Sequence, residues 1–213
     1  ATRSLAVAIK RLVCITLIAA LGLTATLAAV DLDRMQLLAL QRYGQQTADM
    51  VAEWRRMITE VQGLPEEQKL VKVNDFFNKL DFVDDSLHWR QEDYWATPVE
   101  FLASNGGDCE DFSLAKYFTL KAMGVNERRL NLTYVKALSL DQAHMVLTYF
   151  EVPGEEPLVL DNLVGEIKLA SERTDLLPVY SFNGTGLWIA KMRGRGEMVG
   201  KSDQLRRRKE LLT

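Results

Sequence analysis

The hydrophobic pattern changes at Gly124, and this change constrains the fold more than any other feature of the chain. Before Gly124, apolar residues recur every three to four positions, as on the buried face of a helix; Trp54, Ile58 and Val61 form one such stripe. After it, apolar and polar residues alternate in short runs separated by turn residues, which is typical of antiparallel strands. Helices followed by strands predict an α+β fold in which N-terminal helices pack on an antiparallel β-sheet.

The pattern also predicts the extent of the elements. Pro65 and Pro98 each occupy the first position of an expected helix, and Thr97-Pro98-Val99-Glu100 has the form of a capping box. The polar and aromatic segment 81–93 lacks periodicity and is expected to be a loop. We expect helices over residues 31–62 and 65–80, a short one from Pro98 and another from Asp108, and strands over 130–138, 143–152, 157–161, 179–182 and 187–192.

The N-terminal segment predicts export. Arg3, Lys10 and Arg11 precede the uncharged, apolar run 12–30, which ends in small residues. Residues 1–30 are therefore interpreted as an export signal or an N-terminal anchor, since the run is almost long enough to cross a bilayer; a core helix is the alternative. We expect a periplasmic protein whose single domain covers residues 31–213, because a chain of 213 residues with 47% hydrophobic content can bury one good core.

The charge balance argues against nucleic acid as a partner. The whole chain has a formal net charge of −3. Residues 1–29 carry three basic groups and no acidic one, so the remainder has a charge of −6. The basic run Arg206-Arg207-Arg208-Lys209 is better explained as a solvated tail.

Asp108-Cys109-Glu110-Asp111 is the most informative motif. The thiolate is the reactive form of cysteine; a helix start favours it, whereas neighbouring carboxylates oppose it. The conflict disappears if the carboxylates hold a hard cation such as calcium, which prefers oxygen ligands. The motif therefore indicates a nucleophilic cysteine beside a metal site. The alternative is a buried structural cysteine next to a solvated acidic helix start.

Two later residues complete a candidate catalytic set. His144 lies on a predicted strand, where the imidazole could be held rigidly against the Cys109 helix. Asp161 ends the next predicted strand, where its carboxylate could fix the tautomer of His144. Each also has an ordinary structural explanation, because a strand histidine is often a satisfied core residue and Asp-Asn is common turn chemistry.

Cysteine on a helix, then histidine and aspartate on successive strands, resembles the transglutaminase-like branch of the papain-type fold, and more closely the bacterial transglutaminase-like cysteine proteinases. The resemblance extends from about Trp54 to Ala190. It rests on three motifs: Asn105-Gly106-Gly107-Asp108-Cys109-Glu110-Asp111, Gln142-Ala143-His144-Met145-Val146-Leu147 and Leu160-Asp161-Asn162.

The resemblance implies specific roles. Cys109 would be the nucleophile, His144 the general base and acid, and Asp161 the orienting carboxylate. Asp108, Glu110 and Asp111 would belong to a calcium site. Because calcium takes roughly six to eight oxygens, other ligands are needed, and Asp93 is the candidate. The Cys109 amide would stabilise the oxyanion, with Trp95 as a possible second donor.

The resemblance also implies a biological setting. Periplasmic members of this family cut large cell-surface adhesins, control biofilm attachment, and are inhibited by an inner-membrane receptor for cyclic di-GMP. Three functions stay open at this stage: a calcium-dependent cysteine endopeptidase, an acyltransferase or amidase on the same fold, and a non-catalytic calcium-bound binding module. The triad alone does not separate the first two.

Overall fold

A computed structural model describes residues 34–189 and 198–200 of the protein. The chain divides into two compact units, Ala1–Ala52 and Glu53–Thr213. In the first unit, residues 34–43 are helical, and Gly44, with a positive φ of 93°, precedes α2 (Gln45–Val61). The expected export segment 1–30 lies outside the described residues. Within the described ranges, no helix has the length and apolar character needed to span a membrane.

The second unit contains the predicted helices. Trp54, Ile58 and Val61 in the second half of α2 are buried, which confirms their apolar stripe. The capping box is also confirmed, because the Thr97 hydroxyl accepts from the Glu100 amide and the Glu100 side chain accepts from the Thr97 amide. The helical elements after α2 are α3 (Glu66–Phe77), α4 (Asp85–His88), α5 (Pro98–Ala103), α6 (Cys109–Ala122), η1 (Glu127–Arg129) and η2 (Ala170–Glu172).

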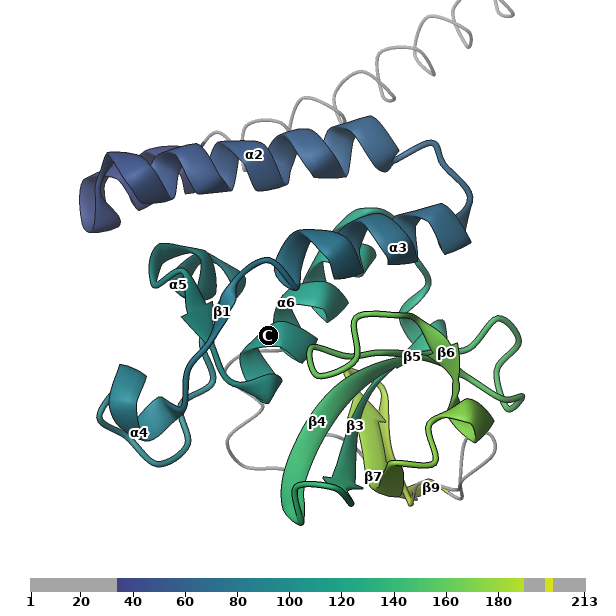
Figure 1. Ribbon diagram of the computed structural model, residues 1–213. Coiled ribbons are helices and arrows are strands. Elements are labelled where there is room, and N and C mark those ends of the chain that lie inside the picture. Colours follow the sequence, from purple (N-terminus) through teal and green to yellow (C-terminus); the bar gives the residue numbers. More distant parts are fainter. Residues whose placement is uncertain (1–33, 190–197, 201–213) are drawn as a thin grey trace, which may run out of the picture. The chain divides into compact units, whose positions relative to one another are not determined.

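Helix α6 is the centre of this unit and lies between α3 and the sheet (Figure 1). The Trp54 indole donates to the Thr119 hydroxyl at 2.9 Å, and the Lys69 ammonium donates to the Met123 carbonyl at 2.9 Å. Phe118 is only half-buried, whereas its neighbours Tyr117 and Thr119 are buried. Nine residues of α6 are buried, because elements cover it on several sides rather than along one stripe.

The strands after Gly124 form an antiparallel sheet, as predicted. Its order is β6-β5-β4-β3-β7-β8-β9. Leu147 pairs with Leu160, so the chain leaves β5 at Asp161 beside the middle of β4. The strands are β3 (Leu130–Ala137), β4 (Gln142–Tyr149), β5 (Leu158–Leu160), β6 (Lys168–Leu169), β7 (Leu176–Asn183), β8 (Gly186–Ile189) and β9 (Met198–Gly200).

A second, two-stranded parallel sheet was not predicted. It pairs β1 (Asp81–Phe82) with β2 (Gly106–Gly107). The expected loop 81–93 therefore contains β1 and α4. The reason is physical: strands of two residues show no alternation, and two glycines carry no side chains to reveal one. This pair matters for function, because β2 leads directly into Asp108 and α6.

We predict that Gly106→Ala destabilises the protein. A Cβ at Gly106 would lie 2.3 Å from the Asp81 carbonyl oxygen, so the two strands would have to separate. Forced overpacking of this kind costs about 1–3 kcal/mol. Urea unfolding should show this loss for Gly106→Ala, whereas Gly63→Ala, with open space around its Cβ, should unfold like the wild type or slightly later. Equal stability of the two variants would contradict the assigned pairing.

Candidate active site

The N-terminus of α6 is built around Cys109. Asp108 is the N-cap, and its carboxylate accepts a hydrogen bond from the Glu110 amide at 3.1 Å. Cys109 is therefore the first residue of the helix, as predicted. It is partly buried and is not part of a disulfide within the described residues. Amide groups in the first turn have no acceptor within the helix, so this end presents N–H donors and favours negative charge.

His144 and Asp161 form a buried pair. Nε2 of His144 lies 2.7 Å from Oδ1 of Asp161, and the side chains are 5% and 0% exposed. Asp161 follows β5 and is brought to His144 of β4 by the pairing of the two strands. An ionised carboxylate only accepts hydrogen bonds, so Nε2 carries the proton, and Nδ1 is the nitrogen left with a lone pair in the neutral ring.

Three groups fix Asp161. The backbone amide of Leu163 donates to Oδ1 at 3.1 Å, and the Arg173 guanidinium donates to Oδ2 at 2.7 Å. The side-chain amide of Asn78 donates to the backbone carbonyl of Asp161 at 2.8 Å. Burial alone would raise the pKa of Asp161, but the hydrogen bond and charge of His144, with hydrogen bonds from Arg173 and the Leu163 backbone amide, outweigh it and lower the pKa to about 2. Asp161 is therefore an anion over the whole physiological range.

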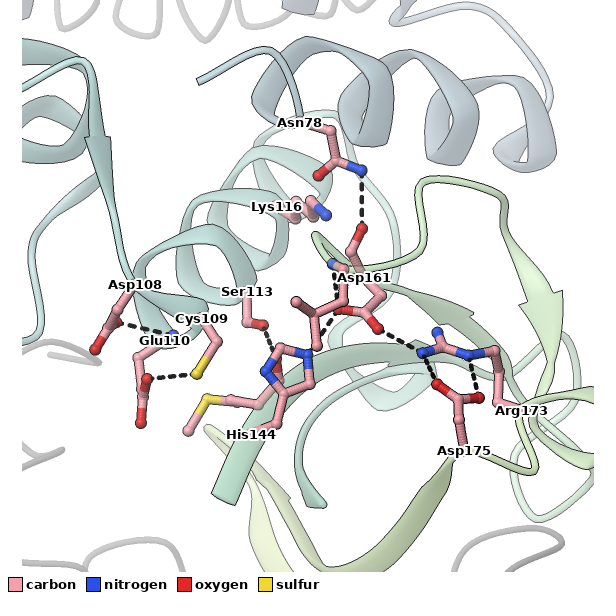
Figure 2. A network of polar contacts seen from close by, with 12 residues as sticks. Asn78, Asp108, Cys109, Glu110, Ser113, Lys116, His144, Asp161, Arg173 and Asp175 are labelled. Carbon is pink, nitrogen blue, oxygen red and sulfur yellow. Dashed lines mark hydrogen bonds and ion pairs between the residues drawn. The ribbon is translucent and has the colours of Figure 1, made fainter. Parts of the chain in front are cut away.

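Packing of α6 on β4 brings Cys109 to the same place. The Ser113 hydroxyl donates to the Met145 carbonyl at 3.1 Å, and the Met145 amide interacts with the Cys109 sulfur. Figure 2 shows the Cys109 side chain on the side of α6 that faces His144. The structure thus gathers the three predicted catalytic residues at the junction of α6, β4 and the end of β5.

The thiol of Cys109 is hydrogen-bonded to the carboxylate of Glu110. It donates to Oε2 of Glu110 at 2.8 Å, while Oε1 of Glu110 accepts from the Tyr134 hydroxyl at 3.0 Å. Burial raises the pKa of Cys109 strongly, and the charges of Glu110 and Asp108 raise it further. The conflict predicted between the helix end and its carboxylates is therefore present, and the protonated thiol is favoured.

A second acidic group lies on the other side of Asp108. Carboxylate oxygens of Asp85, Asp108 and Asp111 lie within 4.8 Å of one another. One oxygen of Asp85 accepts from the Tyr94 amide, and one of Asp111 from the Ala96 amide at 2.7 Å. The other oxygens, Asp85 Oδ1 and Asp111 Oδ2, are buried without a hydrogen-bond partner in the described part of the chain.

The negative charges of this cluster would be stabilised by a bound cation. Burial raises the pKa of all three aspartates, and neighbouring carboxylates add to it: Glu110 acts on all three, and Asp93 also acts on Asp85. The pKa of Asp108 reaches about 9 and that of Asp111 about 7. Gly107 lets the cluster close, because a Cβ there would lie 2.2 Å from Asp111 Oδ2. Orphaned oxygens on a rigid frame suit an oxygen-binding divalent ion such as calcium.

The sequence identified part of this cluster. Asp108 and Asp111 belong to it, whereas Glu110 belongs to an adjoining group with Asp108 and Cys109. Asp93 accepts from the Trp95 indole at 2.8 Å and is not among the grouped ligands of the described residues, so its role stays a prediction. Trp95 also stacks on Phe182, with 6.3 Å between the ring centroids, and its role as a second oxyanion donor stays a prediction.

Two important residues had not been predicted. Asp85 sits in the segment expected to be a loop, and its only sequence signal is an acidic pair with Asp84. Arg173 follows the 3-10 turn η2 and is 3% exposed. A single arginine in an irregular segment gives no signal that it is buried, although a buried aspartate near it would require such a partner.

Comparison with known proteins gives a match to one protein family. The sequence model of the bacterial transglutaminase-like cysteine proteinases, BTLCP, matches residues 37–189. A search of the curated proteins found no match.

Solved structures of Legionella pneumophila LapG are similar. The first is 43% identical, covers 85% of this chain and 95% of its own, and has a TM-score of 0.74. The EGTA-treated structure is 44% identical with the same coverage and a TM-score of 0.75. The calcium-bound structure is 46% identical, covers 83% of this chain and 98% of its own, and has a TM-score of 0.71.

The low pKa of Asp161 predicts a specific acid dependence of stability. The pKa is depressed on folding from 3.8 to about 2, so the stabilisation is complete above pH 4 and is lost as the pH falls through about 2. The shift corresponds to about 2 kcal/mol. Urea unfolding between pH 4.5 and 2 should show a smaller loss of free energy for Asp161→Asn than for the wild type. Identical slopes would refute the buried ion pair.

Proposed function

Because the chain belongs to the bacterial transglutaminase-like cysteine proteinase family, we propose that it is a calcium-dependent cysteine endopeptidase with a Cys109–His144–Asp161 triad. The observation that carries the assignment is the 2.7 Å contact between His144 Nε2 and Asp161 Oδ1, at the point where α6 packs on β4. This contact leaves Nδ1 as the nitrogen that can serve Cys109 as a base.

Acylation follows from these positions. The Cys109 thiol transfers its proton to Nδ1 of His144, and the sulfur bonds to the carbonyl carbon of the scissile peptide. The Cys109 amide donates to the oxyanion, since first-turn amides have no intrahelical acceptor. As the C–N bond breaks, the imidazolium returns the proton to the departing amine, and a thioester remains on Cys109. Asp161 stabilises the imidazolium throughout.

Deacylation reuses the same base. Nδ1 of His144 takes a proton from a water molecule as its oxygen bonds to the thioester carbon. The C–S bond breaks, the carboxylic acid leaves, and the sulfur regains the proton from His144. Asp161 is ionised at every relevant pH, so the dyad keeps one tautomer through both half-reactions.

Calcium has a defined place in this proposal. Asp85, Asp108 and Asp111 would hold it, with Glu110 adjoining, and backbone carbonyls or water would complete the coordination. When bound, the ion would neutralise Asp108, whose charge opposes thiolate formation together with that of the adjoining Glu110. Support comes from the orphaned oxygens Asp85 Oδ1 and Asp111 Oδ2 and from the calcium-bound structure of LapG from Legionella pneumophila.

We further propose a large cell-surface adhesin, cut near its N-terminus, as the substrate, and an inner-membrane cyclic-di-GMP receptor as the inhibitor. The cleavage would take place in the periplasm and control biofilm attachment. The support for this setting is the resemblance to the periplasmic proteases of the family, together with the basic and apolar N-terminal segment. An adhesin fragment with a small-residue site is the appropriate test substrate.

We predict that Cys109→Ala abolishes cleavage of such a fragment, because no nucleophile remains. Fragment products are to be followed by mass spectrometry with calcium present. His144→Ala should be equally inactive, and Asp161→Asn should be slower by a factor on the order of 10³–10⁴, as expected when the tautomer is no longer fixed. Asp141→Asn, in an exposed pair with Lys136, is the matched control and should retain full activity.

The same assay separates the competing functions. An acyltransferase would convert a primary amine into a conjugate of the substrate, whereas a peptidase yields free carboxyl and amino termini. A binding module would keep its biological effect after Cys109→Ala, and that result would rule out the proteolytic assignment.

A second prediction concerns the calcium ligands. Asp85→Asn and Asp111→Asn should weaken calcium binding strongly in isothermal titration calorimetry, since each has a buried oxygen with no hydrogen-bond partner among the residues that the structure describes. Asp93→Asn is the matched comparison, because its carboxylate already accepts from Trp95. A larger loss for Asp93→Asn than for Asp85→Asn would show that the cluster of three aspartates is not the calcium site.

A further inference from the structure

We propose that Arg173 is a positioning residue of the triad, which holds Asp161 in the orientation that serves His144. The inference rests on the proposed function and extends it to a residue that neither the motifs nor the comparisons indicate. The supporting observation is a row of four side chains, alternately basic and acidic, in which each is hydrogen-bonded to the next: His144, Asp161, Arg173 and Asp175 (Figure 2).

The first observation is how the two oxygens of Asp161 are divided. Oδ1 receives His144 Nε2 at 2.7 Å and the Leu163 amide at 3.1 Å, whereas Oδ2 receives Arg173 Nη2 at 2.7 Å. Because donors hold both oxygens, any partial rotation of the carboxylate about its Cβ–Cγ bond would weaken all three contacts. The side chains of Asp161 and Arg173 are 0% and 2% exposed, so water offers little replacement.

The second observation is that Arg173 is itself fixed. Its Nε donates to Asp175 Oδ1 at 2.9 Å, and its Nη2 donates to Asp175 Oδ2 at 2.7 Å. The side chain of Asp175 is 41% exposed, so the row leads from the buried dyad to the surface. A planar guanidinium held by two nitrogens has little freedom to turn, which a lysine ammonium would have.

The third observation concerns the other charges near Asp161. His144 faces it from β4 and Lys116 from α6. The Lys116 ammonium donates to Asn74 Oδ1 at 2.9 Å and acts on Asp161 only through its charge. Among the described side chains, Arg173 is therefore the cation that hydrogen-bonds to the catalytic carboxylate. Without it, Oδ2 would be a buried anionic oxygen with no donor, and a rotated or protonated carboxylate would be favoured.

The test uses the full chain with calcium. Arg173→Met removes the charge, Arg173→Lys keeps it without the planar fork, and Arg129→Met is the matched control. Arg129 also forms a partly buried ion pair, with Glu66 at 2.5 Å, but it lies at the opposite end of β3 and β4 from His144. Two properties are to be measured: the NMR resonance of the His144 Nε2 proton, and the rate of Cys109 alkylation by iodoacetamide, read from the mass of the Cys109 peptide.

Arg173→Met should lose the His144 resonance, or lose it at a higher pH than the wild type as the solution is acidified, because Asp161 protonates more readily without its cation. Alkylation should slow on the order of 10–100-fold, as is typical when a supporting partner of a functional side chain is removed. Arg173→Lys should give a His144 resonance and an alkylation rate between those of Arg173→Met and the wild type. Added guanidinium should partly restore both properties in Arg173→Met. Arg129→Met should keep the wild-type resonance and rate.

An unchanged resonance and an unchanged rate in Arg173→Met would overturn the proposal. Should that variant not fold, Arg173→Lys decides: wild-type values for both properties would overturn it, and a weakened resonance with slower alkylation would support it. Failure of the proposed function looks different. In that case His144→Ala would leave alkylation unchanged, whereas failure of the Arg173 inference alone would leave His144→Ala slow and Arg173→Met normal.

Discussion

The structure depends on the burial of α6 between α3 and the sheet. A helix enclosed in this way must find partners for its polar groups inside the protein. Trp54 satisfies Thr119, and Asn74 satisfies Lys116. At the N-terminus, Ser113 binds the backbone of β4 next to His144, and this bond sets the helix against the strand. The position of Cys109 relative to His144 thus follows from how the core is packed.

The buried and partly buried carboxylates near this helix start have pKa values shifted in opposite directions. Asp161 has an internal cation, Arg173, and hydrogen bonds that lower its pKa to about 2. Asp85, Asp108 and Asp111 have no such ion pair within the described ranges, and burial together with neighbouring carboxylates raises their pKa values. The first carboxylate is permanently ionised and can orient a base. The second set needs an ion from outside, which makes the reactivity of Cys109 dependent on calcium in our proposal.

The surroundings of Cys109 also favour its protonated thiol. Burial and the charges of Glu110 and Asp108 raise its pKa, and the thiol donates to Glu110. Neutralisation of Asp108 by a bound ion would reduce the negative charge that opposes the thiolate, and Nδ1 of His144 would then compete with Glu110 as acceptor of the thiol proton. A calcium requirement would then arise from the same four-residue motif that supplies the nucleophile.

The sequence predicted the fold class and the parts of the site that local patterns record. Cys109 was found through its place at a capped helix start, and His144 and Asp161 through their places on predicted strands. Asp85 and Arg173 were missed because their roles arise only from tertiary contacts. Asp85 depends on the β1–β2 pair, whose strands of two residues carry no periodic signal. Arg173 depends on a turn that returns the chain to the end of β5.

The most direct test of the account is a crystal structure of the calcium-loaded protein at high resolution. We expect a calcium ion bound by Asp85, Asp108 and Asp111, with the Cys109 sulfur released from Glu110 and within hydrogen-bond distance of His144 Nδ1. A thiol that stays on Glu110 while calcium is bound, or an imidazole turned away from Cys109, would contradict it.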